Sequence, residues 1–283
     1  MYIRQEHEMK KLPTYSDWSI FNKLINTAQP LKKYTWDIKD SPWFTSYNDY
    51  LSELKSEYKQ HLKKSNKELK SLGGDPSHRS WKNFRPLRLS REEDWADWLM
   101  HLIEHSETGI LAHTLIGRND ENPEFFVQPK KTFRELTDKS KKYRADMIMK
   151  WLDGSYTHIE VKIGDGHLKK TYPTSEVFRK QFGINESKWK NYILLLDEQL
   201  LDWENVVAHT DYKIDILPIT WTKVAVAIRK SLMSTESIVW KSWAYSYVGV
   251  IEEILLRISP EQEESLSSQQ LLKRNEIIRK SYL

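Results

Sequence analysis

A run of five apolar residues from Tyr192 to Leu196 constrains the fold of this 283-residue chain more than any other segment. The run has the length of a β-strand, and successive side chains of a strand point to opposite faces of the sheet. A strand that is apolar at every position is therefore covered on both faces, as expected for a buried central strand with helices packed on either side. The segment from Ile214 to Ile219 predicts one more strand.

Two further strands are predicted upstream, and a short turn joins them. Residues 144–149 and 156–163 have the pattern of strands, and Asp153-Gly154 between them is a turn signal. The other predicted elements are a strand at residues 125–129, a helix from Ser90 to about Ser106–Gly109 and a helix from Thr174 to about Phe182. The order of these elements predicts an α/β fold with a central mixed β-sheet flanked by helices.

The two ends of the chain are predicted to be helical additions to this core. Apolar residues recur at helical spacing from Tyr47 to Leu62, and Gly73-Gly74-Asp75-Pro76 then breaks the chain. After Trp221 the apolar residues again follow helical spacing. We therefore expect an N-terminal helical addition at residues 1–86, a core at residues 87–220 and a C-terminal helical region at residues 221–283.

The helix that is predicted to begin the core has a marked start. The segment Ser90-Arg91-Glu92-Glu93 has the pattern of a capping box, in which Ser90 caps the helix and Glu93 reaches back to the cap. An apolar face that includes Trp95 and Leu99 follows. The helix is therefore expected to pack this face on the core.

Composition limits the classes of protein to which the chain can belong. There are no cysteines, which excludes disulfides and zinc sites built on thiolates. No apolar run approaches the roughly 20 residues that a membrane-spanning helix needs, and the N-terminus lacks the pattern of a signal peptide. A soluble cytoplasmic protein with no membrane partner is the expectation.

The charge of the chain is close to balanced, but basic residues gather in one region. The formal net charge is only +4, from 44 basic and 40 acidic residues, which does not by itself identify a nucleic-acid binder. Basic residues nevertheless flank the segment from Asp146 to Lys162 on both sides, at Lys130, Lys131, Lys139, Lys141, Lys142, Arg144, Lys169, Lys170, Arg179, Lys180, Lys188 and Lys190. For each of them a solvated loop or helix face is an equally good interpretation.

Acidic and basic side chains gather on the two strands that the Asp153-Gly154 turn joins. Asp146 lies on the first strand, and Glu160 and Lys162 lie two residues apart on the second, so the latter two share one face. Ile159, Val161 and Ile163 take the other face of the same strand. The alternative is that Glu160 and Lys162 form a cross-strand pair on a solvated sheet edge.

Two carboxylates and a lysine at one end of a sheet suit the hydrolysis of a phosphodiester. Mg²⁺ takes oxygen ligands, commonly one or two carboxylates with waters and a phosphate, and Mn²⁺ is a plausible substitute. Asp146 and Glu160 can supply the carboxylates, and the backbone carbonyl of Val161 can add a third oxygen. Lys162 can hold or help to deprotonate the attacking water, or steady the phosphate.

A carboxylate from a neighbouring helix often completes such a site. Glu92 lies one helical turn before Trp95 and so continues the buried face of its helix, whereas Glu93 is already assigned to the capping box. Glu92 is therefore preferred over Glu93, and Glu104 is a weaker third choice.

These residues together resemble the PD-(D/E)XK nuclease superfamily, which has the restriction-endonuclease-like fold. The resemblance covers roughly residues 88–200. The segments Arg91–Leu99 and Glu160–Asp165, with Lys170-Thr171 behind them, look like one bacterial branch of the superfamily in which most members are uncharacterised. The resemblance implies a DNA substrate, Mg²⁺ and a catalytic set of Glu92, Asp146, Glu160 and Lys162. The chain departs from the family pattern at Ala145, where a proline is common.

The resemblance leads us to expect a Mg²⁺-dependent endodeoxyribonuclease of bacterial restriction or anti-phage defence. A catalytically silent nuclease-fold module that binds nucleic acid or a partner protein is the alternative. The helical additions suit docking to a helicase, an ATPase or another defence-system subunit, and a homodimer is left open.

Other side chains near the site could contact DNA. Arg144 could bind phosphate or form a structural ion pair, and Lys170, Thr171 and Gln181 could bind phosphate or serve only surface solubility. Aromatic residues on the predicted C-terminal helix are expected to pack in the core, with a base-stacking role as the alternative; they are Trp240, Trp243 and Tyr247.

Overall fold

A computed structural model describes residues 42–81, 89–117, 128–164, 171–208, 215–258 and 268–282. The chain divides into two compact units, Met1–Tyr50 and Leu51–Leu283. In the first unit the described residues form only the beginning of helix α2. Lys170 and most of the strand predicted at residues 125–129 lie outside the described residues.

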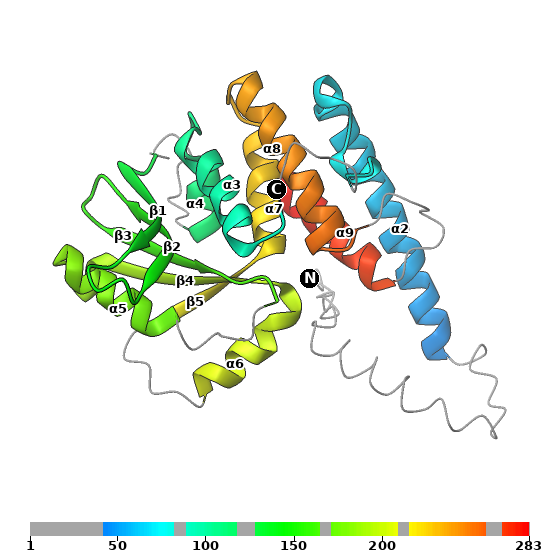
Figure 1. Ribbon diagram of the computed structural model, residues 1–283. Coiled ribbons are helices and arrows are strands. Elements are labelled where there is room, and N and C mark those ends of the chain that lie inside the picture. The colour runs from blue at the N-terminus through cyan, green and yellow to red at the C-terminus, as the bar shows by residue number, and fades with distance from the viewer. Residues whose placement is uncertain are drawn as a thin grey trace, which may run out of the picture. The chain divides into compact units, whose positions relative to one another are not determined.

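A mixed five-stranded sheet forms the centre of the second unit (Figure 1). Its strands are β1 (Lys131–Thr137), β2 (Arg144–Lys150), β3 (Tyr156–Val161), β4 (Trp189–Leu195) and β5 (Ile216–Thr220), adjacent to one another in that order. The pairs β1–β2 and β2–β3 are antiparallel, and the pairs β3–β4 and β4–β5 are parallel. The predicted α/β architecture with a mixed sheet is therefore confirmed.

The first strand of the sheet was not predicted. Strand β1 follows residues 128–130, which are described and do not form a strand. It lies at the edge of the sheet, and none of its seven residues is fully buried. Because no face of β1 is fully buried, its sequence lacks both the continuous and the alternating apolar pattern that marks the other strands.

Helices cover both faces of the sheet, as Figure 1 shows. Tyr192 and Leu194 on β4 contribute to one hydrophobic cluster, and Ile193 and Leu195 contribute to another, so successive residues of β4 pack on opposite faces. The first face packs on α3 (Glu92–Glu104), α4 (Ile110–Ile116), α7 (Trp221–Leu232) and α8 (Ile238–Val250), and the second on α5 (Thr171–Phe182) and α6 (Leu200–Ala208). The predicted burial of the Tyr192–Leu196 run on both faces is confirmed, except that the strand ends at Leu195.

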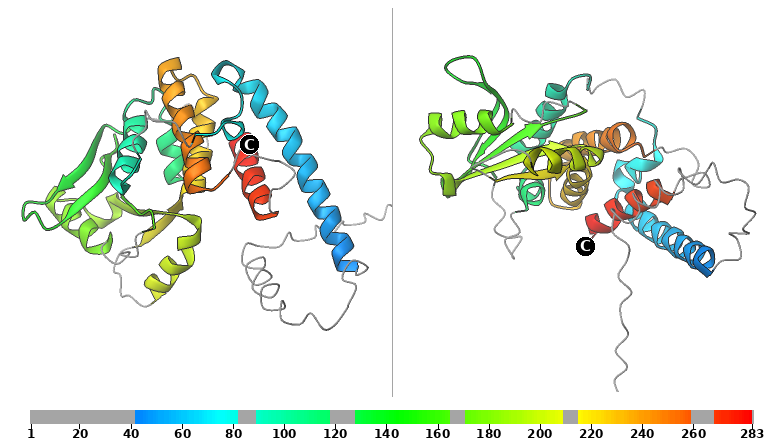
Figure 2. Two further views of the ribbon diagram at one scale, coloured as in Figure 1. Left: turned by 45° about the vertical axis from the view of Figure 1, so that its right-hand side comes forward. Right: turned by 90° about the horizontal axis from the view of Figure 1, so that it is seen from below.

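The remaining elements flank this core, and Figure 2 shows α2 beside α9 in two views. They are α2 (Pro42–Glu68), η3 (Lys70–Leu72), η4 (Pro76–His78), η7 (Glu186–Lys188), η8 (Asp197–Gln199), the π-helical segment η9 (Ile251–Leu255) and α9 (Ser268–Tyr282). The predicted chain break falls at Gly73 and Gly74, whose φ angles of 103° and 96° lie in a region that glycine adopts readily.

The hydrophobic core crosses the predicted boundaries at residues 87 and 221. One cluster of buried residues includes Leu69 before the first boundary, Met147 in the predicted core and Ile277 on α9. These positions come together because α7 packs on α4 and α9, while α8 packs on α3, which itself contacts the sheet. Residues from Leu51 onward therefore form one compact unit, in which the helical N- and C-terminal regions pack on the core.

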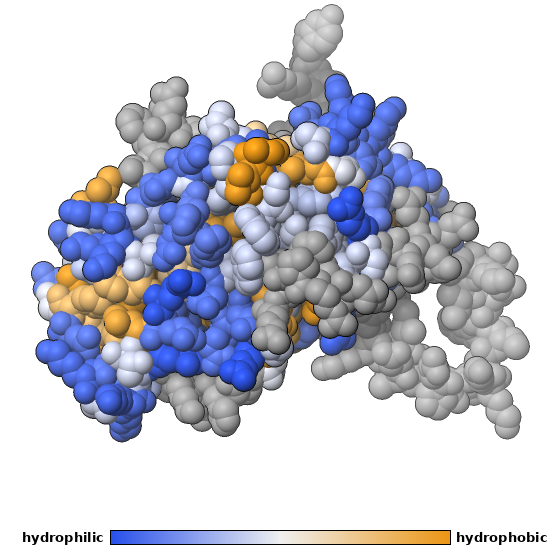
Figure 3. All heavy atoms as spheres, turned by 45° about the horizontal axis from the view of Figure 1, so that its top comes forward, coloured by the Kyte–Doolittle hydropathy of each residue, from blue (hydrophilic) through white to orange (hydrophobic). Residues whose placement is uncertain are grey.

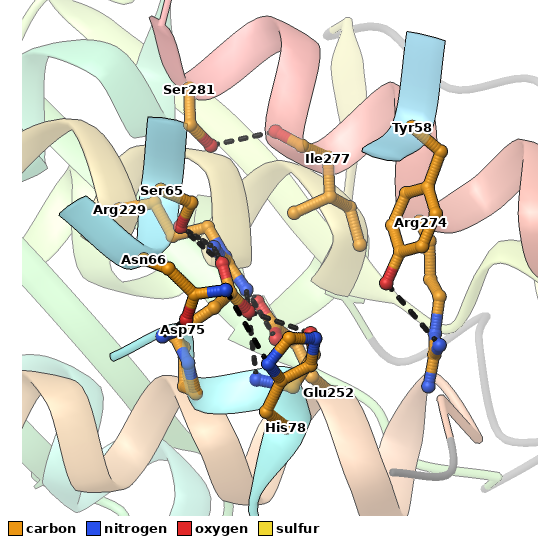
Figure 4. Close-up of polar contacts among 12 residues, drawn as sticks. Tyr58, Ser65, Asn66, Asp75, His78, Arg229, Glu252, Arg274, Ile277 and Ser281 are labelled. Carbon is orange, nitrogen blue, oxygen red and sulfur yellow. Dashed lines mark hydrogen bonds and ion pairs between the residues drawn. The ribbon is translucent and has the colours of Figure 1, made fainter. Parts of the chain in front are cut away.

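A buried ionic cluster joins three elements of this unit, and Figure 4 shows its side chains. Arg229 on α7 forms two hydrogen bonds to Asp75, of 2.7 and 2.9 Å, and two to Glu252, of 2.6 and 2.8 Å. All three side chains are almost completely buried. The guanidinium therefore ties the segment that follows α2 to α7 and to η9.

The face of the molecule drawn in Figure 3 is mainly hydrophilic. Figure 3 shows one face of the molecule, on which hydrophobic residues appear only as limited patches. None of the helices within the described ranges is both long and apolar enough to cross a membrane.

Candidate active site

Asp146 lies directly against the end of strand β3. Its Oδ2 atom accepts a hydrogen bond of 2.8 Å from the backbone N–H of Val161. The antiparallel register, which pairs Met147 with Ile159, brings the two positions to the same level of the sheet. The two strands predicted to carry the carboxylates are therefore adjacent, as expected.

Lys162 lies between two carboxylates at the point where β3 ends. Its Nζ atom is 3.4 Å from Oε1 of Glu160 and 3.7 Å from Oε2 of Glu92. Its backbone N–H donates a hydrogen bond of 2.8 Å to the carbonyl of Leu194, which extends the pairing with β4 by one residue. This backbone bond holds the lysine on the same side as Glu160, as the two-residue spacing predicts.

Glu92 is the first residue of α3 and reaches the end of β3. Its Oε1 atom accepts a hydrogen bond of 2.5 Å from the backbone N–H of Ile163. The structure thus brings Glu92 to Asp146, Glu160 and Lys162, whereas the side chain of Glu104 accepts a hydrogen bond from Thr132 instead.

The predicted role of Glu93 in a capping box is wrong. Helix α3 begins at Glu92, one residue later than the pattern suggests, so Asp94 is its third residue. Asp94 accepts hydrogen bonds of 2.9 Å from the backbone N–H groups of Ser90 and Arg91. Glu93 is therefore free of the cap and accepts a hydrogen bond of 2.8 Å from Arg144.

Glu160 and Lys162 are buried, which excludes the solvated-edge interpretation. Their exposed fractions are 6 % and 8 %. Strand β3 lies between β2 and β4, and all six of its residues are buried. A carboxylate and an ammonium group in such a place need partners, because burial of an uncompensated charge costs several kcal/mol or more.

The three carboxylates outnumber the single lysine, and the pKa values of Asp146 and Glu160 are raised. Burial and then the nearby charge of Asp146 raise the pKa of Glu160 to about 8, although Lys162 acts in the opposite direction. Burial also raises the pKa of Asp146, against the hydrogen bond from Val161 and the charge of Lys162. The site therefore has an excess of negative charge that a bound cation would relieve.

The buried side chain of His158 lies beside the carboxylate of Glu160. Its Nε2 atom lies 3.8 Å from Oε2 of Glu160, and its ring stacks on Trp189 with ring centres 6.2 Å apart. Burial lowers the pKa of His158 to about 4, while the side chain of Asn191 opposes that shift. The imidazole is therefore neutral at pH 7. His158 lies two residues before Glu160 on β3 and so shares its face of the strand, but nothing in the sequence pairs it with Trp189.

The donor set fits a hard divalent cation. Oε2 of Glu160 is buried and accepts no hydrogen bond from the described residues. No three His, Asp or Glu side chains in the described ranges are close enough together to hold a metal ion. Asp146 and Glu160 thus provide two carboxylates, and with the Val161 carbonyl they match Mg²⁺, which takes one or two carboxylates and keeps several waters.

The side chains predicted to contact DNA lie in different environments. Arg144 forms ion pairs with Glu93 at 2.8 Å and with Glu135 at 3.8 Å. Of the two roles considered for this residue, phosphate binding and a structural ion pair, the ion pair is the one observed. Thr171 is completely buried at the start of α5, so its hydroxyl does not reach a surface where phosphate could bind. Gln181 is exposed on α5.

The aromatic residues of α8 divide into two groups. Trp240 and Tyr247 are buried, as expected for core packing. Trp243 is 38 % exposed, and its ring centre lies 5.2 Å from that of Trp98 on α3. The prediction of core packing is therefore wrong for Trp243, because it lies on the outer face of the helix.

The Glu160→Gln variant is expected to be more stable than the wild type at alkaline pH without divalent metal. Because folding raises the pKa of Glu160 from 4.5 to about 8, the stability linked to its protonated form is fully present below pH 4.5 and is lost as the pH rises through 8. Glutamine does not ionise, so the variant keeps this part of the free energy of unfolding at alkaline pH, a difference on the order of a few kcal/mol. Denaturant unfolding in a chelator at about pH 6 and about pH 9 measures it.

The matched control is Glu204→Gln, a substitution of an exposed glutamate on α6. It should follow the pH dependence of the wild type. Identical pH profiles for all three proteins would contradict the raised pKa of Glu160.

Comparisons of the chain with protein-family models, with curated proteins and with solved structures found no match in any of the three.

Proposed function

We propose that the chain is a metal-dependent endodeoxyribonuclease with a restriction-endonuclease-like core of the PD-(D/E)XK type. The observation that carries the proposal is the junction of β2, β3 and α3. There the carboxylates of Asp146, Glu160 and Glu92 gather around the ammonium group of Lys162. The excess negative charge and the buried, unbonded oxygen of Glu160 support a role in holding a cation.

Each residue has a separate part in this proposal. Asp146 and Glu160, with the backbone carbonyl of Val161, would hold Mg²⁺, or Mn²⁺ in its place. A bound Mg²⁺ would supply charge neutralisation at the phosphate and a water of lowered pKa. Lys162 orients the attacking water or the phosphate through its N–H groups. Glu92 accepts from Ile163 and lies beside Lys162, so it orients the lysine.

The proposed substrate is DNA, and the proposed setting is bacterial restriction or anti-phage defence. The sequence resemblance supports both. The terminal helices, which would suit docking to a helicase, an ATPase or another defence subunit, belong to the same compact unit as the site. The rival is a silent nuclease-fold module that binds nucleic acid or a partner protein.

Plasmid nicking tests the proposal. The purified chain is incubated with supercoiled DNA and Mg²⁺ or Mn²⁺, beside Asp146→Asn and the control Asp202→Asn, an exposed position on α6. We expect metal-dependent nicking by the wild type and the control, and loss of it in Asp146→Asn. Equal nicking by all three would remove the assigned site, and DNA binding without nicking by any of them would favour the silent module.

Two neighbouring glutamates offer a matched pair of substitutions. Glu92→Gln removes the carboxylate beside Lys162 and is expected to slow cleavage by roughly 10- to 100-fold, as for other residues that orient a reactive group. Glu93→Gln removes only a half-exposed ion pair with Arg144, which is worth about 0–1 kcal/mol, and should leave the rate roughly unchanged. Initial cleavage rates compare the two. The opposite ranking would show that Glu93 is the helix carboxylate.

A further inference from the structure

The C-terminal end of α3 carries two histidines one helical turn apart, with His105 as the residue that caps the helix. His101 and His105 are spaced i and i+4, which places their side chains on one face of the helix. Their ring centres lie 4.2 Å apart with an interplanar angle of 36°. Unlike His113 and His158, which are buried, His105 is exposed and His101 is partly exposed.

The local hydrogen bonds leave a nitrogen of His105 free to bind a metal. Its Nδ1 atom lies 2.9 Å from the backbone carbonyl oxygen of His101. Because a carbonyl only accepts, Nδ1 must carry the proton, and the neutral ring then has its lone pair on Nε2. Metal-binding histidines commonly donate their other ring N–H to a backbone carbonyl in this way.

The neighbours of His101 pack against its ring, and the nearby carboxylates bond to other residues. The edge of Trp98 packs against His101 with ring centres 5.6 Å apart. The acidic neighbours of the pair are engaged elsewhere, since Asp97 forms an ion pair of 3.1 Å with Arg134 and Glu104 accepts from Thr132. The pair therefore presents two neighbouring imidazoles, of which His105 is exposed and His101 partly exposed.

We propose that His101 and His105 form a two-imidazole site for a divalent transition metal of the Zn²⁺ class. Imidazole nitrogen suits Zn²⁺, Ni²⁺ and Cu²⁺, whereas Mg²⁺ requires oxygen ligands. No third metal-binding side chain joins the pair among the described residues. Water or a side chain of another molecule would fill the remaining positions, and the site binds rather than catalyses, because a catalytic zinc centre has three protein ligands.

This site is separate from the proposed Mg²⁺ site. Glu92 begins α3 and His105 follows its last residue, so the two are 13 residues apart on one helical axis. At about 1.5 Å per residue, this separates their Cα atoms by roughly 20 Å. The two sites also differ in their donor atoms, oxygen at one and nitrogen at the other.

Zinc titration of the full chain in the presence of saturating Mg²⁺ tests the proposal, with a chromophoric competitor reporting free Zn²⁺. We expect the wild type to bind Zn²⁺, and either His101→Asn or His105→Asn to lower the affinity by at least roughly tenfold. Substitution of residues that only contact metal ligands already lowers metal affinity by that factor. The matched control is His78→Asn, at an exposed histidine on η4, which should leave that affinity unchanged.

Three results would overturn the site. The first is that the wild type binds no Zn²⁺. The second is that both His101→Asn and His105→Asn bind Zn²⁺ with wild-type affinity. The third is that His78→Asn loses as much affinity as they do. Glu160→Gln should keep the zinc affinity, which separates this test from the nuclease proposal. Circular dichroism of each variant shows that the fold is kept.

Discussion

Lys162→Met is expected to lower the single-turnover rate of Mg²⁺-dependent DNA cleavage by about 10²–10⁴-fold, the usual contribution of a residue that positions or transfers a proton. Methionine keeps the length and apolar stem of the side chain but has no N–H group to orient water or phosphate. The Nζ atom lies 3.4 Å from Glu160 and 3.7 Å from Glu92, which places it within the proposed metal site rather than at its rim. The loss should therefore appear in the chemical step.

Two comparisons make this prediction specific. Lys59→Met, at an exposed lysine of α2, should cleave at the wild-type rate. Mn²⁺ should still bind to Lys162→Met, because its proposed ligands are Asp146, Glu160 and the Val161 carbonyl. A Lys162→Met protein that cleaves DNA as fast as the wild type would show that the lysine is structural.

Arg229→Met is expected to cost about 3–5 kcal/mol of the free energy of unfolding, as is typical when one member of a buried ion cluster is removed. Burial by itself would raise the pKa of Asp75, but the charge and hydrogen bonds of Arg229 hold it below its usual range. Burial raises the pKa of Glu252, and Arg229 only partly offsets this rise. Methionine would leave both carboxyl groups buried without their common partner.

Denaturant unfolding of three variants measures this effect. The control Arg134→Met removes a half-exposed ion pair with Asp97 and should cost at most about 1 kcal/mol. Adding Glu252→Gln to Arg229→Met should restore part of the stability, because the unpaired carboxylate is then neutral. A loss below about 1 kcal/mol in Arg229→Met would contradict the structural role of the cluster.

Elements with a strong local pattern were predictable. The turn at Asp153-Gly154 and the alternation around Glu160 predicted β2, β3 and their pairing. The same alternation placed Glu160 and Lys162 together, because a period of two residues fixes the face of each side chain. The continuous apolar run of β4 likewise predicted a strand buried on both faces.

Features that depend on contacts far apart in the chain were not predictable. The ion pair of Arg229 with Asp75 joins residues 154 positions apart, and no local pattern marks either partner. The capping residue of α3 was missed by one position, since Asp94 and Glu93 are both suitable acids and only the helix start decides between them. The His101–His105 spacing, in contrast, is visible in the sequence as a His-x-x-x-His pattern.

The most direct test of the central claim is an anomalous difference map from crystals of the chain that contain Mn²⁺. The account predicts a peak bonded to carboxylate oxygens of both Asp146 and Glu160, at about 2.1 Å, the distance at which ions of this kind bind oxygen. A well-ordered map with no peak between these two side chains at saturating Mn²⁺ would contradict the account.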